Sequence, residues 1–136
     1  MELNYIMNDK SISKDMLSML RKSVEWYSVD DYFEKFIQNS YLYICCYDGK
    51  QLIGFLNVIS NGCSDAYIQD VAVNPSYQGI GIGTKMMEMA IGELKRQNID
   101  AIVIFFESSL YNFYKRFGFF KVEAGILTTD MDKPVV

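Results

Sequence analysis

The stretch from residue 66 to about residue 95 constrains the fold more than any other part of the chain. Residues 66–73 are typical of a strand, and a glycine-dense loop over residues 78–83 follows shortly after. Directly behind this loop, from about residue 84, apolar residues recur at helical spacing: Met86, Met87, Ala90, Ile91 and Leu94. A strand that leads through a loop into an amphipathic helix predicts a fold in which helices pack on a sheet.

The residues before this unit predict two helices and an antiparallel meander. Ser13 is a suitable N-cap for a first helix, and Asp48-Gly49 is a tight-turn dipeptide between two runs of strand-forming residues. In chain order we expect a strand within residues 1–7, a helix from Ser13, a helix around residues 32–37, a hairpin of residues 41–47 and 51–59, and the strand 66–73.

The residues after the unit complete the predicted fold. Residues 101–106 (AIVIFF) form a continuous apolar run, which is typical of a strand covered on both faces beside a crossover helix. We expect a short helix over residues 110–117 that Gly118 ends, and a closing pair of strands at residues 119–123 and 126–131. The predicted fold class is α/β (α+β), with a mixed, mainly antiparallel sheet of six to seven strands flanked by about four helices.

Composition narrows the possible functions. No repeat, Pro-rich linker or low-complexity stretch divides the 136 residues, so we expect a single domain over residues 1–136. A net charge of -4 argues against a nucleic-acid-binding surface. The absence of histidine excludes Ser-His-Asp and Cys-His catalysis as well as histidine metal ligands, and we expect no metal.

The cysteines and the apolar runs bear on the cellular compartment. We expect Cys45, Cys46 and Cys63 to be free, buried thiols in a reducing cytoplasm, since a reactive thiol would lack a histidine base. Residues 1–10 lack the apolar core of a signal peptide, and no apolar run approaches the roughly 20 residues of a membrane span. We therefore expect a soluble cytoplasmic protein without a membrane partner.

The glycine loop predicts a phosphate or pyrophosphate ligand. Glycines leave backbone N–H groups open to a ligand, and a helix N-terminus adds unsatisfied donors and partial positive charge. The alternative is a purely structural tight loop capped by Thr84. The nucleotide motifs do not fit, because Gly83 is followed by Thr84-Lys85 where a Walker A loop needs Lys before Ser or Thr. In the dinucleotide fingerprint counted from Gly79, the sixth position is Thr84 and not glycine.

The spacing Gln78-x-x-Gly81-x-Gly83 resembles the coenzyme A signature of the GNAT superfamily of N-acetyltransferases. Residues 70–79 (DVAVNPSYQG) resemble the strand and loop before that signature, and residues 113–119 (FYKRFGF) resemble a later element of the family. Two motifs in the correct order on the expected elements make this resemblance specific. It implies a GNAT-like fold and acetyl-CoA as co-substrate.

The resemblance also implies which residues bind coenzyme A. The main-chain groups of Val71 and Val73 would lie along the pantetheine arm, and Val71 would also polarise the thioester carbonyl. The pyrophosphate would be bound by the loop amides and the start of the helix: Gln78, Gly79, Ile80, Gly81, Ile82, Gly83 and Thr84.

Two residues are candidates for proton transfer. Tyr114 matches the family position of the general acid that protonates the leaving thiolate, although its spacing with Leu110 and Phe117 is equally that of a core residue. Asp70 is the candidate for amine binding or base catalysis, with a surface or structural acid as the alternative. Glu107 stands where many relatives carry an asparagine that contacts the cofactor, and its role stays open.

The leading hypothesis is an N-acetyltransferase that moves an acetyl group from acetyl-CoA to a primary amine by direct attack in a ternary complex. The acceptor is a small-molecule or peptide amine whose identity the sequence leaves open. A homodimer is common among relatives. The alternatives are a non-catalytic acyl-CoA-binding or regulatory module and a protein-interaction module that is indifferent to coenzyme A.

Overall fold

A computed structural model describes residues 1–130 and 132, and every structural count below refers to these residues. The chain divides into two compact units, residues 1–105 and residues 106–136. Each unit is described by itself.

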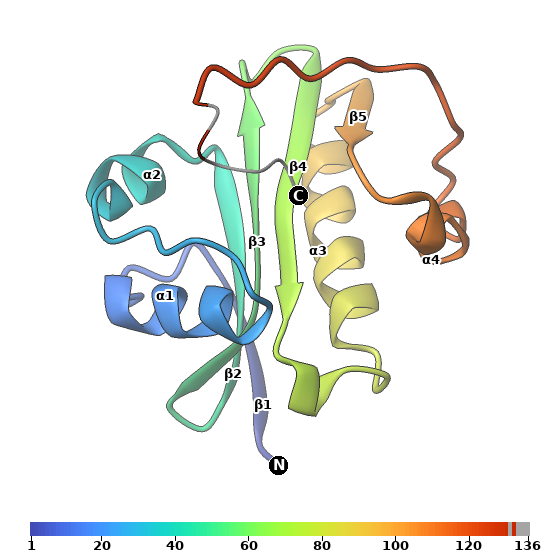
Figure 1. The fold of residues 1–136 in the computed structure, drawn as a ribbon. Helices are drawn as coiled ribbons and strands as arrows, with labels where there is room; N and C mark the ends of the chain where they lie inside the picture. Colours follow the sequence, from blue (N-terminus) through green and yellow to red (C-terminus); the bar gives the residue numbers. More distant parts are fainter. Residues whose placement is uncertain (131, 133–136) are drawn as a thin grey trace. The chain divides into compact units, whose positions relative to one another are not determined.

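The first unit is built on a five-stranded sheet in the order β1-β2-β3-β4-β5 (Figure 1). The first four strands pair antiparallel with one another, and β5 pairs parallel with β4. The strands are β1 (Leu3–Met7), β2 (Leu42–Asp48), β3 (Gln51–Ser60), β4 (Asp65–Val73) and β5 (Ala101–Ile104). The mixed, mainly antiparallel α/β architecture is confirmed, and the described strand count is five where six to seven were predicted.

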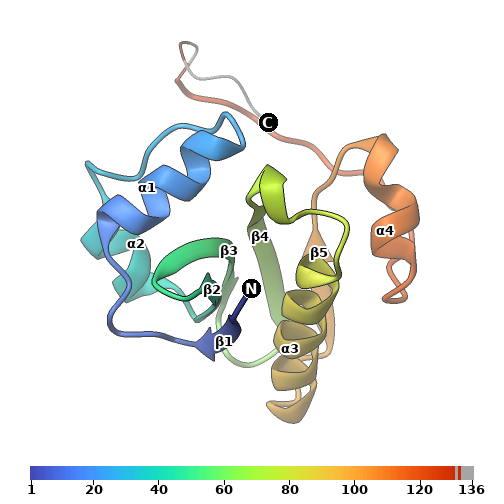
Figure 2. The same ribbon diagram turned by 90° about the horizontal axis from the view of Figure 1, so that it is seen from below.

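Helices cover both faces of this sheet (Figure 2). The N-terminal helices α1 (Lys14–Ser23) and α2 (Phe33–Asn39) lie on one face, and α3 (Ile82–Arg96) lies on the other. Ser13 caps α1 as predicted, because its side chain accepts a hydrogen bond of 3.2 Å from the Met16 amide. The crossover through α3 is what allows β5 to run parallel to β4.

Strands β2 and β3 form the centre of the core, where side chains alternate between the two helical layers. Phe55 is buried among residues of α1 and α2, and its ring centroid lies 6.3 Å from that of Phe36. Its neighbour Gly54 faces α3, where a Cβ would lie only 3.1 Å from Ile82 and Met86. Glycine at this position therefore lets α3 approach the sheet closely.

Strand β5 is shorter and more exposed than the sequence predicted. It ends at Ile104, and Val103 keeps 39% of its surface exposed, so the strand is not covered on both faces. An apolar run cannot by itself distinguish a fully buried strand from one at the edge of a sheet.

The second unit contains a 3-10 turn η2 (Ser108–Leu110) and the short helix α4 (Tyr111–Lys115). Gly118 follows with a φ of 100°, a left-handed conformation that suits glycine beyond a helix end. The predicted closing strands at residues 119–123 and 126–131 are wrong as far as residue 130, where no strand is formed, and Met131 lies outside the described residues. Strand-forming residues need a neighbouring strand to pair with.

The three cysteines are free, as predicted, but only Cys45 and Cys46 are buried. Cys63 is exposed in the turn between β3 and β4, where the Asn61 side chain accepts a hydrogen bond from its amide. Among the described residues, no helix has the length and apolar character required to cross a membrane.

Candidate active site

Strand β4 contains a β-bulge directly before the predicted coenzyme A loop. Gln69 pairs with Asn57 and Ala72 pairs with Phe55, so Asp70 and Val71 together stand opposite a single residue of β3. Asp70 adopts a φ of 57°, which is uncommon for a residue other than glycine. Such a bulge kinks the strand and turns the backbone groups next to it.

The main-chain groups of Val71 and Val73 point away from β3. The Asn74 amide donates to the Ile53 carbonyl at 2.8 Å, so Asn74 faces β3 and the alternating backbone of Val73 faces the opposite side. On that side, the pairing of β4 with β5 ends at Ile68 and Ile104. Val71 and Val73 therefore lie on a stretch of β4 that has no strand partner on its β5 side within the described residues.

The glycine loop connects this open stretch to α3. Gly79 and Gly81 have φ values of 81° and 94°, and apart from the adjacent residues no atom lies within 4 Å of where a Cβ would stand at either position. Gly81 is the N-cap of the 15-residue helix α3, whose first turn has no acidic residue. The open space, the left-handed backbone and the positive end of the helix dipole fit a pyrophosphate group.

The helix begins earlier than the sequence predicted. It starts at Ile82 and not near residue 84, so Gly83 and Thr84 belong to the first helical turn. Ile82 is buried and Ile80 is 53% exposed. Both side chains are apolar, so only the backbone of these two residues is suited to bind an anion. Gln78 lies at the start of the loop, and its side-chain amide donates to the Val73 carbonyl at 2.9 Å.

Asp70 has a partner that the sequence did not reveal. The Arg21 guanidinium of α1 lies 3.2 Å from the Asp70 carboxylate, and its Nε donates to the Tyr27 carbonyl at 2.6 Å. The indole ring of Trp26 packs 5.3 Å from the same guanidinium. Residues 21 and 70 are far apart in the chain, and no local pattern signals their contact.

Tyr114 lies in the second unit, within an aromatic cluster of that unit. Its ring centroid is 5.0 Å from that of Phe106 and 4.9 Å from that of Phe113. Tyr114 is 6% exposed, and burial raises the pKa of its phenol to about 12. Tyr114 therefore occupies the packing position that its spacing indicated, and its role as general acid stays a prediction. Glu107, whose role was left open, is exposed at the start of η2.

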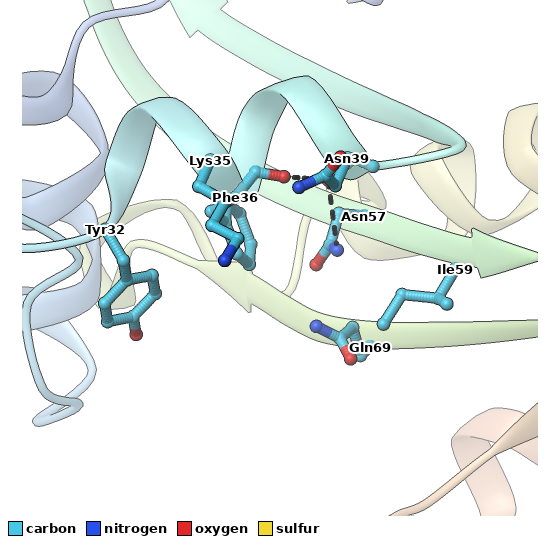
Figure 3. A pocket seen from close by; sticks show the side chains of 8 residues that line it. Tyr32, Lys35, Phe36, Asn39, Asn57, Ile59 and Gln69 are labelled. Carbon is cyan, nitrogen blue, oxygen red and sulfur yellow. Dashed lines mark hydrogen bonds between the residues drawn. The ribbon is translucent and has the colours of Figure 1, made fainter.

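A pocket of about 240 Å³ lies between α2 and the strands β3 and β4 (Figure 3). Asn57 of β3 is 1% exposed, and its side-chain carbonyl oxygen has no hydrogen-bond partner. Gln69, its partner across the strands, also lines the pocket and directly precedes the bulge. Asn57 was missed from the sequence, although an amide inside the apolar run of residues 52–58 is a recognisable signal.

The described residues contain no group of three or more Cys, Asp or Glu side chains that could hold a metal ion. Within the first unit, the groups available for binding and chemistry are backbone amides, a carboxylate and amide side chains.

Comparison with known proteins identifies the class. The profile of the acetyltransferase (GNAT) family matches residues 10–119, and the chain belongs to this family. An uncharacterized N-acetyltransferase, ycf52, of Pyropia yezoensis is 31% identical over 127 residues, which is 90% of this chain and 73% of that protein.

Two solved structures share the fold. A probable acetyltransferase from meticillin-resistant Staphylococcus aureus has a TM-score of 0.80 at 23% identity, covering 93% of this chain and 99% of that one. A predicted acetyltransferase from Clostridium acetobutylicum, solved with acetyl-CoA, has a TM-score of 0.72 at 20% identity, covering 93% and 96%. This protein is thus an acetyltransferase of the GNAT family.

Proposed function

We propose that this protein transfers an acetyl group from acetyl-CoA to a primary amine, by direct attack of the amine in a ternary complex. The observation that carries the proposal is the stretch of β4 at Val71 and Val73, which has no strand partner on its β5 side within the described residues and leads within a few residues into the glycine loop. A strand edge with free amides next to an anion-binding helix start suits an elongated ligand with a pyrophosphate at one end.

The residues have distinct tasks in this proposal. Acetyl-CoA, when bound, supplies an activated thioester. The Val71 amide donates a hydrogen bond to the thioester carbonyl oxygen, on which negative charge develops. Val73 aligns the pantetheine arm that leads to this thioester. The amides from Gln78 to Thr84 bind the pyrophosphate. Transfer in a ternary complex then depends on alignment of the two reactants more than on covalent chemistry by the protein.

Proton transfer needs one acid and one base. The family resemblance assigns the acid to Tyr114, whose phenol stays protonated because burial raises its pKa to about 12. Asp70, or water next to it, accepts the proton that the amine loses. Arg21 fixes the position of the Asp70 carboxylate from α1.

Two measurements test the proposal in order. Titration calorimetry with acetyl-CoA should show binding, and release of free thiol across a panel of primary amines should show turnover. Binding without turnover on any amine would support a non-catalytic acyl-CoA-binding module. No binding at millimolar acetyl-CoA would contradict the coenzyme A site itself.

A further inference from the structure

We propose that the pocket between α2, β3 and β4 selects a small amine with one apolar ring that carries a hydrogen-bond donor, and that Asn57 is the specificity-determining residue. This inference rests on the proposed function, because it assigns the acceptor side of the same reaction. Its evidence is separate from the coenzyme A loop and comes from the pocket alone.

The orientation of the Asn57 side chain is fixed by its neighbours (Figure 3). Ser40 Oγ donates its proton to the Phe36 carbonyl at 2.8 Å, so toward Asn57 it can act only as an acceptor. Asn57 Nδ2 donates to this oxygen at 3.4 Å, which leaves Oδ1 without a partner. A flipped amide would place two acceptors against each other, and the buried Oδ1 therefore presents an unmet acceptor to a ligand.

The walls of the pocket favour a ring. Tyr32, the N-cap residue of α2, and Phe36 within the helix have their ring centroids 6.1 Å apart in an edge-to-face arrangement, and Ile59 lies on the strand side (Figure 3). The volume of about 240 Å³ is below the roughly 300–1,000 Å³ of sites for drug-sized ligands. A single ring with a short chain therefore suits the pocket better than a peptide does.

The charge of the pocket disfavours polyamines. Lys35 is the one charged residue among the described residues that line it, and no carboxylate accompanies it. A second ammonium group on the ligand would meet a like charge without an acidic partner. The donor that pairs with Asn57 Oδ1 is therefore an uncharged O–H or N–H on the ring.

The distance along the strand sets the length of the ligand. Gln69 lines the pocket opposite Asn57, and Val71 follows two residues later, which spans at most roughly 7 Å because the bulge at Asp70 and Val71 shortens the strand. A ligand whose ring donor pairs with Asn57 must place its amine about that far away to reach the thioester carbonyl that the Val71 amide binds. A ring with a two-carbon aminoalkyl chain has about this reach.

Tyramine and 2-phenylethylamine test the proposal as a matched pair, because they differ only in the ring hydroxyl. The wild-type protein should use tyramine with a kcat/KM at least tenfold higher, since 2-phenylethylamine leaves Asn57 Oδ1 unpaired. The diamine putrescine should be the poorest of the three substrates. Asn57→Leu should lower the ratio of kcat/KM for tyramine to that for 2-phenylethylamine about tenfold, because it removes the acceptor that distinguishes the two amines.

A binding measurement tests the same preference for tyramine independently of turnover. In ¹⁵N-labelled wild-type protein, tyramine should shift the Asn57 side-chain amide resonances more than 2-phenylethylamine does at the same concentration. Asn4→Leu, at an exposed position of β1, is the control variant and should keep the wild-type preference. The wild-type comparisons decide the matter even if Asn57→Leu does not fold.

The failures of the two proposals are distinguishable. Acetyl-CoA binding together with equal use of both ring amines, or with equal Asn57 shifts, would overturn the assignment of the pocket alone. A selectivity ratio that survives in a folded Asn57→Leu would do the same. Loss of acetyl-CoA binding would instead overturn the proposed function.

Discussion

The guanidinium of Arg21 on α1 lies 3.2 Å from the carboxylate of Asp70, at the bulge of β4. This pair ties the N-terminal helix to the strand that leads into the predicted coenzyme A loop. Arg21 is 12% exposed and Asp70 is 32% exposed, so the pair is partly shielded from water. Its disruption should affect both the stability of the fold and the geometry of the bulge.

The first prediction concerns stability. Arg21→Met should lower the free energy of unfolding by about 1–2 kcal/mol, between the values typical of exposed and buried ion pairs. Urea denaturation measures the change. The pair of Arg96 with Glu93 provides the control, because the Arg96 side chain is 70% exposed and Arg96→Met should therefore have a much smaller effect. Equal effects of the two variants would show that partial burial does not strengthen the ion pair of Arg21 with Asp70.

A second prediction separates the two roles considered for Asp70. If Asp70 accepts a proton or binds the amine, Asp70→Asn should lower kcat/KM for the amine by tenfold or more beyond the effect of Arg21→Met. If Asp70 only anchors the bulge, the two variants should lose activity to the same degree. Steady-state rates for both variants with one amine make the comparison, and the equal loss would remove Asp70 from the chemistry.

A third prediction concerns the glycine loop. Gly81→Ala should raise the Kd for acetyl-CoA roughly tenfold, since alanine disfavours the φ of 94° and places a methyl group beside the amides. Gly49→Ala is the matched control, because Gly49 has a φ of 58° and similar open space in the β2–β3 turn. Both variants should lose about 1 kcal/mol of stability. A normal Kd in Gly81→Ala would contradict the assigned site.

A fourth prediction concerns Tyr114. Tyr114→Phe should lower kcat by about a hundredfold and change KM for acetyl-CoA little, because proton donation matters in the transition state. Since the pKa of the phenol is raised to about 12, the ratio of wild-type to variant kcat should stay constant from pH 6 to 10. Tyr111→Phe on the same helix serves as control. A ratio that falls between pH 8 and 10 would contradict a buried, protonated phenol.

The fifth prediction links Cys45 to alkaline stability. Burial raises the pKa of this thiol from 9.0 to about 12. A raised pKa means that the unfolded chain loses the proton first, so this contribution to stability is complete below pH 9 and is lost as the pH rises toward 12. Urea denaturation should therefore show a smaller decline above pH 9 for Cys45→Val than for the wild type. Cys63→Val, at an exposed position, should follow the wild-type curve.

Local sequence patterns were sufficient for most of the first unit. Ser13 and the apolar stripe behind it predicted α1, and Asp48-Gly49 predicted the β2–β3 hairpin, because caps and tight turns depend on residues close in the chain. After residue 118, local sequence patterns were not sufficient to predict the secondary structure. The apolar residues there have strand-forming character, but β-propensity depends on tertiary context and does not by itself produce a strand.

The sequence by itself determined the fold class, the glycine loop and the resemblance to GNAT acetyltransferases, since each depends on residue types at short and fixed spacing. Only the tertiary structure decided that Asp70 and Val71 form a bulge, that Arg21 pairs with Asp70, and that Asn57 has an unpaired buried oxygen. These features arise where segments distant in the chain meet. Strand register and the completeness of hydrogen bonding depend on these long-range contacts, and no local sequence pattern encodes them.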